Sequence, residues 1–198
     1  MPKLLRNRRA LSTVVTTLII LVVSVLLATV VVYYATNVVS TRVQEENLHV
    51  TKQHAWQNAT ASMGSTSYSV ATLMIINTGG RDVVIDKVAI RGQECTWDDT
   101  TRNKFVLYAT ANGSVTQDMP YLANFTAGTN QVTIDSTTYD FNVAPGDLVL
   151  KSGRTLLLYI INPDSISVND VGLTVGIAVH TAQAVYYRET NVEAVAMQ

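Results

Sequence analysis

The sequence has little cysteine, proline or glycine, the residues that cross-link a chain or break its helices. It has one cysteine, Cys95, so no disulfide can form inside one molecule. Only 4 of the 198 residues are proline and 10 are glycine, and neither type occurs between Pro2 and Gly64. Because proline and glycine are the strongest helix breakers, a long helix can form in this first part of the chain.

Charge is scarce and unevenly placed. Four cations, Lys3, Arg6, Arg8 and Arg9, lie in the first ten residues, and the next charged residue is Arg42. The formal net charge is −1, but without these four cations 10 Lys and Arg face 15 Asp and Glu, a net −5. An acidic body argues against a nucleic-acid partner, which requires clustered Lys and Arg.

Residues 11–39 form an uncharged, strongly apolar run. As a helix they would span roughly 43 Å, and a bilayer core requires about 20 apolar residues. A secretory signal has a shorter apolar segment, about 7–15 residues, ended by a small-x-small site that is missing here. The run therefore predicts a transmembrane helix, with Tyr33 and Tyr34 at the interface. The basic N-terminus stays in the cytoplasm and the C-terminal body lies outside.

No breaker ends this helix before residue 58, so the sequence predicts a helical domain over residues 11–60. Arg42 is spaced to meet Glu45 and Glu46 at i+3 and i+4 on this helix. The segment 62–67 then ends it.

From Tyr68 onward the apolar residues follow the period of two that is typical of strands. Two strands flank a turn at 77–80, and pairs such as Asn112-Gly113 and Pro145-Gly146 separate later ones. Strands are predicted at 68–77, 81–90, 104–110, 130–135, 137–143, 154–162, 171–181 and 184–192. The predicted fold class is α+β: a long N-terminal apolar helix followed by an all-β antiparallel sandwich, Ig-like or jelly-roll-like, over 66–198.

No catalytic constellation is recognisable. Neither a Gly-rich phosphate loop nor a Ser/His/Asp signature is present. His49 and His54, five residues apart on the predicted helix, do not stack on one face as a metal pair would. Acidic pairs such as Asp98-Asp99, and the loop acids Asp164 and Asp170, lack EF-hand spacing, so solvated loop acids are the preferred interpretation. We expect a protein that is not an enzyme and uses no cofactor or metal.

Three sequons lie on the side predicted to be external. They begin at Asn58, Asn112 and Asn124, and are candidate N-glycosylation sites in a host that glycosylates.

The predicted helix also has a face of small residues. Thr13, Thr17, Ser24 and Ala28 fall within roughly 60° of one another at about 100° per residue. Thr13-xxx-Thr17 and Ser24-xxx-Ala28 are small-xxx-small pairs, which allow helices to approach closely. The alternative is a lone anchor whose Thr and Ser hydroxyls bond to their own helix.

The N-terminal stretch RRALSTVVTTLIILVVSVLLATVVVYY resembles the start of archaeal type IV pilin-like proteins, the superfamily of archaeal adhesion pilins and archaellins. The resemblance implies leader-peptidase cleavage of residues 1–10, with Arg9 before the cut, Ala10 last in the leader and Leu11 first in the mature chain. The apolar helix is kept, and it enters the filament core after leaving the membrane. The implied protein is a cell-surface filament subunit, for adhesion or motility, that forms a helical homopolymer with a prepilin peptidase and assembly machinery as partners.

Two departures refine this expectation. Bacterial pilins usually have Glu at mature position five, where this chain has Val15, so an archaeal member is favoured. Many archaellins have glycine early in the helix, and this chain has none, which favours an adhesion pilus. One alternative is a membrane-anchored β-sandwich surface protein with its N-terminus inside the cell that does not polymerise. A second is export by the Tat route through Arg8-Arg9, but the other residues expected in a Tat signal are missing.

Overall fold

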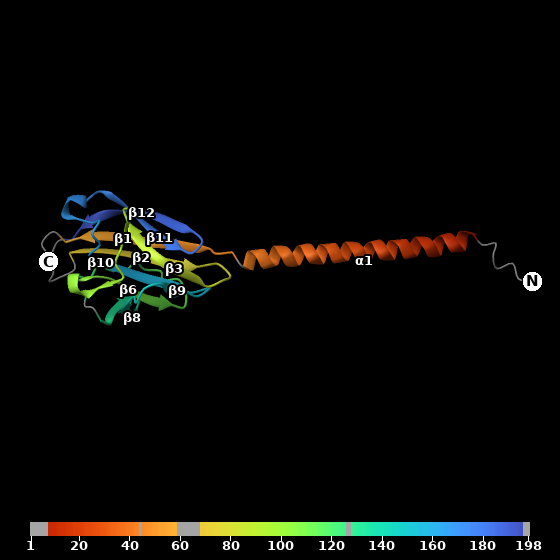
Figure 1. Cartoon of the computed structure of the whole chain (residues 1–198). Helices are drawn as coiled ribbons and strands as arrows, with labels where there is room; N and C mark the ends of the chain where they lie inside the picture. The colour runs from red at the N-terminus through yellow and green to blue at the C-terminus, as the bar shows by residue number, and fades with distance from the viewer. Residues whose placement is uncertain (1–7, 44, 59–67, 126–127, 196–198) are drawn as a thin grey trace, which may run out of the picture. The chain divides into compact units, whose positions relative to one another are not determined.

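The computed structural model describes residues 8–43, 45–58, 68–125 and 128–195, and the chain divides into two units between Gln44 and Glu45 (Figure 1). The first unit contains one helix, α1 (Arg8–Val43). The second, hereafter the β-domain, is built on a 12-stranded sheet. The predicted fold class is confirmed: a long apolar N-terminal helix precedes a largely antiparallel, sandwich-like β-domain.

The predicted strands after residue 68 are all present, with shorter ones between them. The strands are β1 (Leu48–Gln57), β2 (Ser69–Asn77), β3 (Val83–Ile90), β4 (Gln93–Glu94), β5 (Asp98–Asp99), β6 (Lys104–Ala111), β7 (Asn130–Ile134), β8 (Thr137–Val143), β9 (Leu148–Leu150), β10 (Thr155–Ile161), β11 (Thr174–Thr181) and β12 (Val185–Ala194). Two short 3₁₀ helices, η2 (Thr100–Arg102) and η3 (Val168–Asp170), lie in the connections.

The prediction of a helix over residues 11–60 is wrong beyond Val43, where α1 ends. Residues 48–57 form β1, so His49 and His54 lie on a strand. Glu45 and Glu46 lie beyond the helix, and the helical spacing predicted between them and Arg42 does not exist.

A bulge explains why β1 was not recognisable from its pattern. Leu48 and Val50 are buried and His49 is exposed, as expected of a strand. The register with β2 then shifts between Thr51 and His54, and Lys52 adopts a left-handed φ of 54°. A bulge places an extra residue in one strand, and this interrupts the alternation of sides. Pairing with β2 and β12, rather than the local sequence pattern, identifies this segment as a strand.

The strands order as β4-β3-β11-β12-β1-β2-β10-β6-β8-β7. β2 and β3 flank residues 77–80 as predicted but do not pair with each other: β2 pairs with β1 and β10, whereas β3 pairs with β4, β9 and β11. Among the described strands, β1 and β12 form the parallel pair, from Ala55↔Val192 to Gln57↔Ala194. That pair joins the two halves of the folded-over sheet.

Two hydrophobic cores lie on opposite sides of the middle strands. In β10, Leu156, Leu158 and Ile160 belong to the core shared with β3 and β11. Leu157 and Tyr159 belong to the core covered by β7, β8 and the segment 112–125. All seven residues of β10 are buried as a result, which accounts for its continuous apolar sequence TLLLYII.

Candidate functional site

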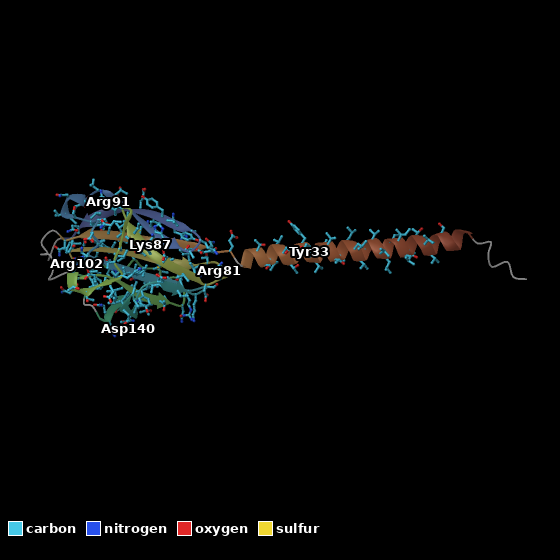
Figure 2. All side chains as sticks on the ribbon, viewed as in Figure 1. Tyr33, Arg81, Lys87, Arg91, Arg102 and Asp140 are labelled. Carbon is cyan, nitrogen blue, oxygen red and sulfur yellow. The ribbon has the colours of Figure 1, made fainter. Side chains whose placement is uncertain are left out.

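The helix α1 exposes an unbroken apolar surface. Its 30-residue segment Ser12–Thr41 is long and apolar enough to cross a membrane. The most apolar 18-residue stretch of this segment has no buried residue. Its length is about 45 Å, against a hydrocarbon core of about 30 Å. Large side chains are exposed along its whole length, up to 71% for Tyr33 (Figure 2). An apolar surface this large is unfavourable in water, so it requires lipid or protein around it.

Several hydroxyl groups of α1 donate hydrogen bonds to carbonyls of the helix itself. The Oγ atoms of Thr16, Ser24, Thr29 and Thr41 donate to the carbonyl four residues earlier at 2.7–2.9 Å. Thr36 donates to the carbonyls of Val32 and Tyr33 at 3.0 and 2.9 Å. Because these hydrogen bonds need no water, the helix can move between lipid and a dry protein bundle without leaving them unmade.

The predicted face of small residues is exposed on α1. Thr13, Thr17, Ser24 and Ala28 are all exposed, and the Thr17 hydroxyl donates to Val14 O at 2.9 Å. The hydroxyl hydrogens of Thr17 and Ser24 are therefore already used within α1. What these residues provide to a neighbouring helix is a small side chain. This face suits close backbone approach, and the same hydroxyl bonds also fit a lone anchor.

The proposed processing residues lie at the start of α1. Its backbone includes Arg9, Ala10 and Leu11, and their side chains lie outside the described residues.

The first residues of the β-domain, which follow α1, are fixed by hydrogen bonds to two of its loops. The carbonyl of Asn47 accepts hydrogen bonds from Thr78 N, Gly79 N and Thr78 Oγ1 at 2.9, 3.1 and 3.1 Å. A Cβ at Gly79 would lie 2.8 Å from Asn47 N and from Glu45 O, so only glycine fits there. On the other side, Thr181 Oγ1 donates to Glu46 Oε1 at 2.5 Å. The turn 77–80, predicted between two strands, lies between β2 and β3 and also holds the entry to β1.

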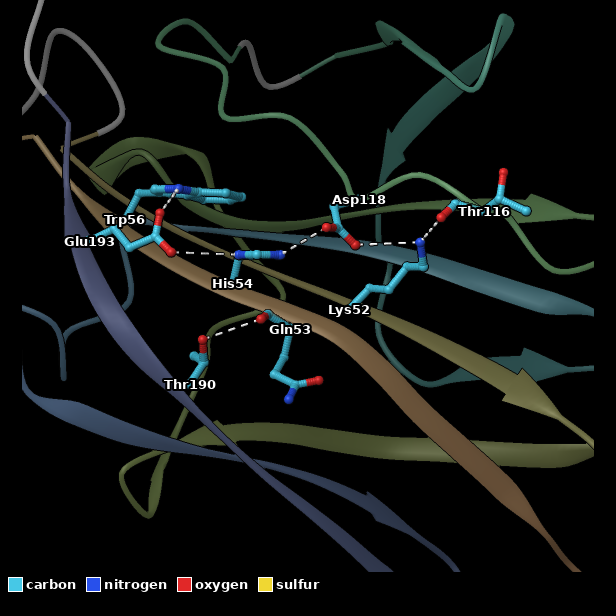
Figure 3. A network of polar contacts seen from close by, with 8 residues as sticks. All are labelled: Lys52, Gln53, His54, Trp56, Thr116, Asp118, Thr190 and Glu193. Carbon is cyan, nitrogen blue, oxygen red and sulfur yellow. Dashed lines mark hydrogen bonds and ion pairs between the residues drawn. The ribbon is translucent and has the colours of Figure 1, made fainter.

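A polar network surrounds the bulge of β1. Lys52 Nζ donates to the carbonyl of Thr116 and lies 3.4 Å from Asp118 Oδ1. The other oxygen of Asp118 is 3.7 Å from His54 Nε2, and His54 Nδ1 is 3.9 Å from Glu193 Oε1 (Figure 3). These contacts join β1, β12 and the segment 112–125. Lys52, whose backbone is left-handed, is the residue of β1 that reaches that segment by both a hydrogen bond and an ion pair.

Aromatic packing completes the network. The rings of His54 and Trp56 stack with centroids 5.2 Å apart and planes 8° apart. Trp56 also meets Tyr121 edge to face at 5.9 Å. Trp56 belongs to the buried core that includes residues of the segment 112–125, whereas the carboxylates of Asp118 and Glu193 are about 60% exposed. It contains no nucleophile activated by a base, and its contacts are those of a structural clamp.

The loop acids Asp164 and Asp170 both form ion pairs. Asp170 accepts hydrogen bonds from Ser167 N and Oγ, both at 2.7 Å, and from the Arg91 guanidinium at 2.5 Å. The hydrogen bonds from Ser167, with the charge of Arg91, hold the pKa of the Asp170 carboxyl below its ordinary value. Asp164 forms an ion pair with Lys104. Within the described ranges, no three His, Cys, Asp or Glu side chains group so as to hold a metal ion.

Cys95, the lone thiol of the chain, is buried in the core between β10 and β3. Burial raises the pKa of its thiol to about 12, so the reactive thiolate is absent at neutral pH.

The three sequons differ in accessibility. Asn112 and Asn124 are exposed, which keeps both as candidates for glycosylation. Asn58 is 2% exposed, its Nδ2 faces the Tyr121 hydroxyl at 3.5 Å, and its backbone N–H donates to Tyr68 O at 2.7 Å. A glycan on Asn58 would have to displace this packing, so the structure counts against that site.

The sequence did not point to the clamp around the β1 bulge or to the contacts of Asn47. The residues of β1 and Asn47 were placed on a helix, and their partners lie 31 to 139 residues away in the chain. Comparison with protein-family models and with curated proteins finds no match to this chain.

Proposed function

We propose that this chain is the structural subunit of an extracellular helical filament of the archaeal type IV pilin-like kind, an adhesion pilus or an archaellum. The observation that carries the proposal is α1: a 30-residue apolar segment exposed on all sides, joined to a separate acidic β-domain. In a filament, copies of α1 from neighbouring subunits would cover this exposed apolar surface.

In this mechanism the precursor first resides in the cytoplasmic membrane. Lys3, Arg6, Arg8 and Arg9 hold the N-terminus inside, because moving four positive charges through hydrocarbon is costly. Cleavage between Ala10 and Leu11 removes that barrier. The helix can then leave the bilayer, and its internally bonded hydroxyls cross with it.

Assembly then replaces lipid by neighbouring helices. At about 25 cal/mol per Å² of apolar surface, burial of such a helix contributes on the order of tens of kcal/mol relative to water. Lipid supplies most of the same burial, so the gain relative to the membrane is far smaller, and an ATP-driven machine is expected to assist. Subunits added head to tail form an open helical polymer with the β-domains outside.

The direct test is N-terminal sequencing of the protein in sheared cell-surface material. Leu11 as the first residue supports a filament subunit; Met1 or Pro2 supports the alternative, a membrane-anchored surface protein that stays unassembled.

Arg9→Asn and Ala10→Leu should block maturation and leave the precursor in the membrane. Thr41→Ser, at the far end of the apolar segment, serves as the control that should mature normally. Filaments built from either processing variant would contradict the mechanism.

A further inference from the structure

We propose that a groove in the β-domain, between the end of β6 and the start of β8, binds a neutral saccharide. This inference goes beyond the filament proposal and does not depend on it, because the groove belongs to a single β-domain.

The groove exists because β6 and β8 separate. Their pairing consists of Leu107↔Val143 and Tyr108↔Asn142. β6 continues to Ala111 along β10, whereas β8 runs alongside β7 toward its start at Thr137. The strands therefore diverge and leave between them a groove of about 370 Å³. This lies within the range of roughly 300–1,000 Å³ that is usual for small-ligand sites.

The two walls of the groove are held at a fixed separation. Thr116 Oγ1 forms a hydrogen bond with Asp135 Oδ2, and Asp135 N donates to Gln117 Oε1 at 3.3 Å. These bonds tie the segment that follows Ser114 to the turn between β7 and β8. Asp135 and Ser136 have left-handed φ angles of 52° and 63°, so this turn is tight. A preformed site loses less conformational entropy on binding.

The lining points to the class of ligand. The groove is lined by Ala111, Gly113 and five polar residues: Thr110, Asn112, Ser114, Thr137 and Tyr139. None of these side chains is charged, which disfavours a charged ligand such as a phosphate or an acidic peptide. Hydroxyl and amide groups both donate and accept hydrogen bonds, as the hydroxyls of a sugar do. The ring of Tyr139, half-buried beside the second core, adds an aromatic face with a polar tip.

The experiment uses the full chain, made in a host that does not attach N-glycans, because Asn112 lines the groove and begins a sequon. The chain is held in a detergent without a sugar headgroup. The probes are neutral disaccharides of glucose, mannose and galactose and, for charge, an acidic disaccharide. Binding is measured by saturation-transfer and chemical-shift NMR.

Gly113→Trp tests the location. Gly113 lines the groove, and a Cβ there would meet nothing within 4 Å, so a bulky indole can be introduced at this position without a backbone clash. Val149→Trp, on β9 at a position 61% exposed, is the matched control. Thr137→Val removes one lining hydroxyl at an exposed position with almost no change of shape. We expect at least one neutral disaccharide to bind, Gly113→Trp to weaken that binding by about tenfold or more, Thr137→Val to weaken it severalfold, and the control to leave it unchanged.

Three outcomes would overturn the proposal. One is the absence of binding by every neutral probe at about 20 mM, a concentration that detects dissociation constants well above 1 mM. Another is equal binding by Gly113→Trp and the wild type. The third is tighter binding of the acidic disaccharide, which would assign the groove to a charged ligand. None of these outcomes affects the filament proposal, whose test is the N-terminus of the assembled protein.

Discussion

The indole Nε1 of Trp56 donates a hydrogen bond of 3.2 Å to Glu193 Oε2, and these two residues are also register partners in the parallel pair of β1 and β12. One side-chain bond thus reinforces the junction at which the two halves of the sheet meet. The indole is 9% exposed and lies between His54 and Tyr121.

Trp56 should therefore be a major contributor to the stability of the β-domain. Trp56→Ala should lower the free energy of unfolding by about 3–5 kcal/mol, the usual cost of removing a large buried aromatic side chain. Trp56→Phe keeps most of the ring but loses the bond to a carboxylate, and should cost about 1.5–3 kcal/mol. Urea unfolding of the detergent-solubilised chain, followed by circular dichroism, measures both. His49→Ala, on the exposed side of β1, is the control; a loss below about 1 kcal/mol for Trp56→Ala would refute the prediction.

The small face of α1 gives a prediction for assembly. Ala28→Leu adds bulk to the face of Thr13, Thr17 and Ser24, where neighbouring helices would approach. We expect the variant to insert into the membrane and lose its leader normally but to yield few or no filaments. Electron microscopy and the amount of sheared surface protein measure this. Thr29→Leu, about 100° around the helix from Ala28, adds similar bulk elsewhere and should assemble; loss of filaments in both variants would remove the special role of the small face.

Asp170 predicts a pH dependence of stability. Because its pKa is lower in the folded chain than in the unfolded chain, the ionised form stabilises the fold. That contribution is fully present above the unfolded pKa of about 3.9 and is lost as the pH falls through the lower folded value. Asp170→Asn should cost about 1.5–3 kcal/mol at pH 7, and the difference from the wild type should shrink in the acid range.

Denaturation at a series of pH values measures this difference. Asp140→Asn, on the exposed side of β8, is the matched control. A difference between Asp170→Asn and the wild type that stays constant from pH 7 to about 2 would show that the carboxylate charge has no stabilising role.

The exposure of the three sequon asparagines predicts which of them can carry a glycan. In a host with N-glycosylation, glycans on the folded chain should be found at Asn112 or Asn124 and not at Asn58, whose side chain is buried beside Tyr121. Mass spectrometry of glycopeptides measures occupancy at each site. Asn112→Gln and Asn124→Gln, made singly, serve as controls for peptide assignment. Higher occupancy at Asn58 than at the two exposed sites would mean that modification precedes folding.

The parts of this fold that local pattern decides were predictable. The apolar run of α1 and the alternating strands from Tyr68 onward are encoded by hydrophobic periodicity within each segment. β1 was not predictable in the same way. Its alternation is interrupted at Lys52, it lacks glycine and proline, and its identity depends on pairing with β2 and β12.

The same reason limits what could be predicted of the sites. The small residues of α1 share a face because of a local helical repeat, so sequence alone brings them together. The network of His54, Asp118 and Glu193 joins segments 64 to 139 positions apart, and no local repeat relates them. The groove between β6 and β8 depends on where two strands stop pairing, which only the assembled sheet determines.

The contacts of Asn47 also have a mechanical consequence. If α1 is held in a filament core, tension on the filament reaches the β-domain through the chain that enters β1. The first bonds to break would be the hydrogen bonds that the carbonyl of Asn47 accepts from Thr78 and Gly79. Behind it, β1 is hydrogen-bonded to β2 over most of its length and to β12 at its far end. A subunit pulled in such a filament would therefore have to break hydrogen bonds along both edges of β1 before the β-domain could open from this end.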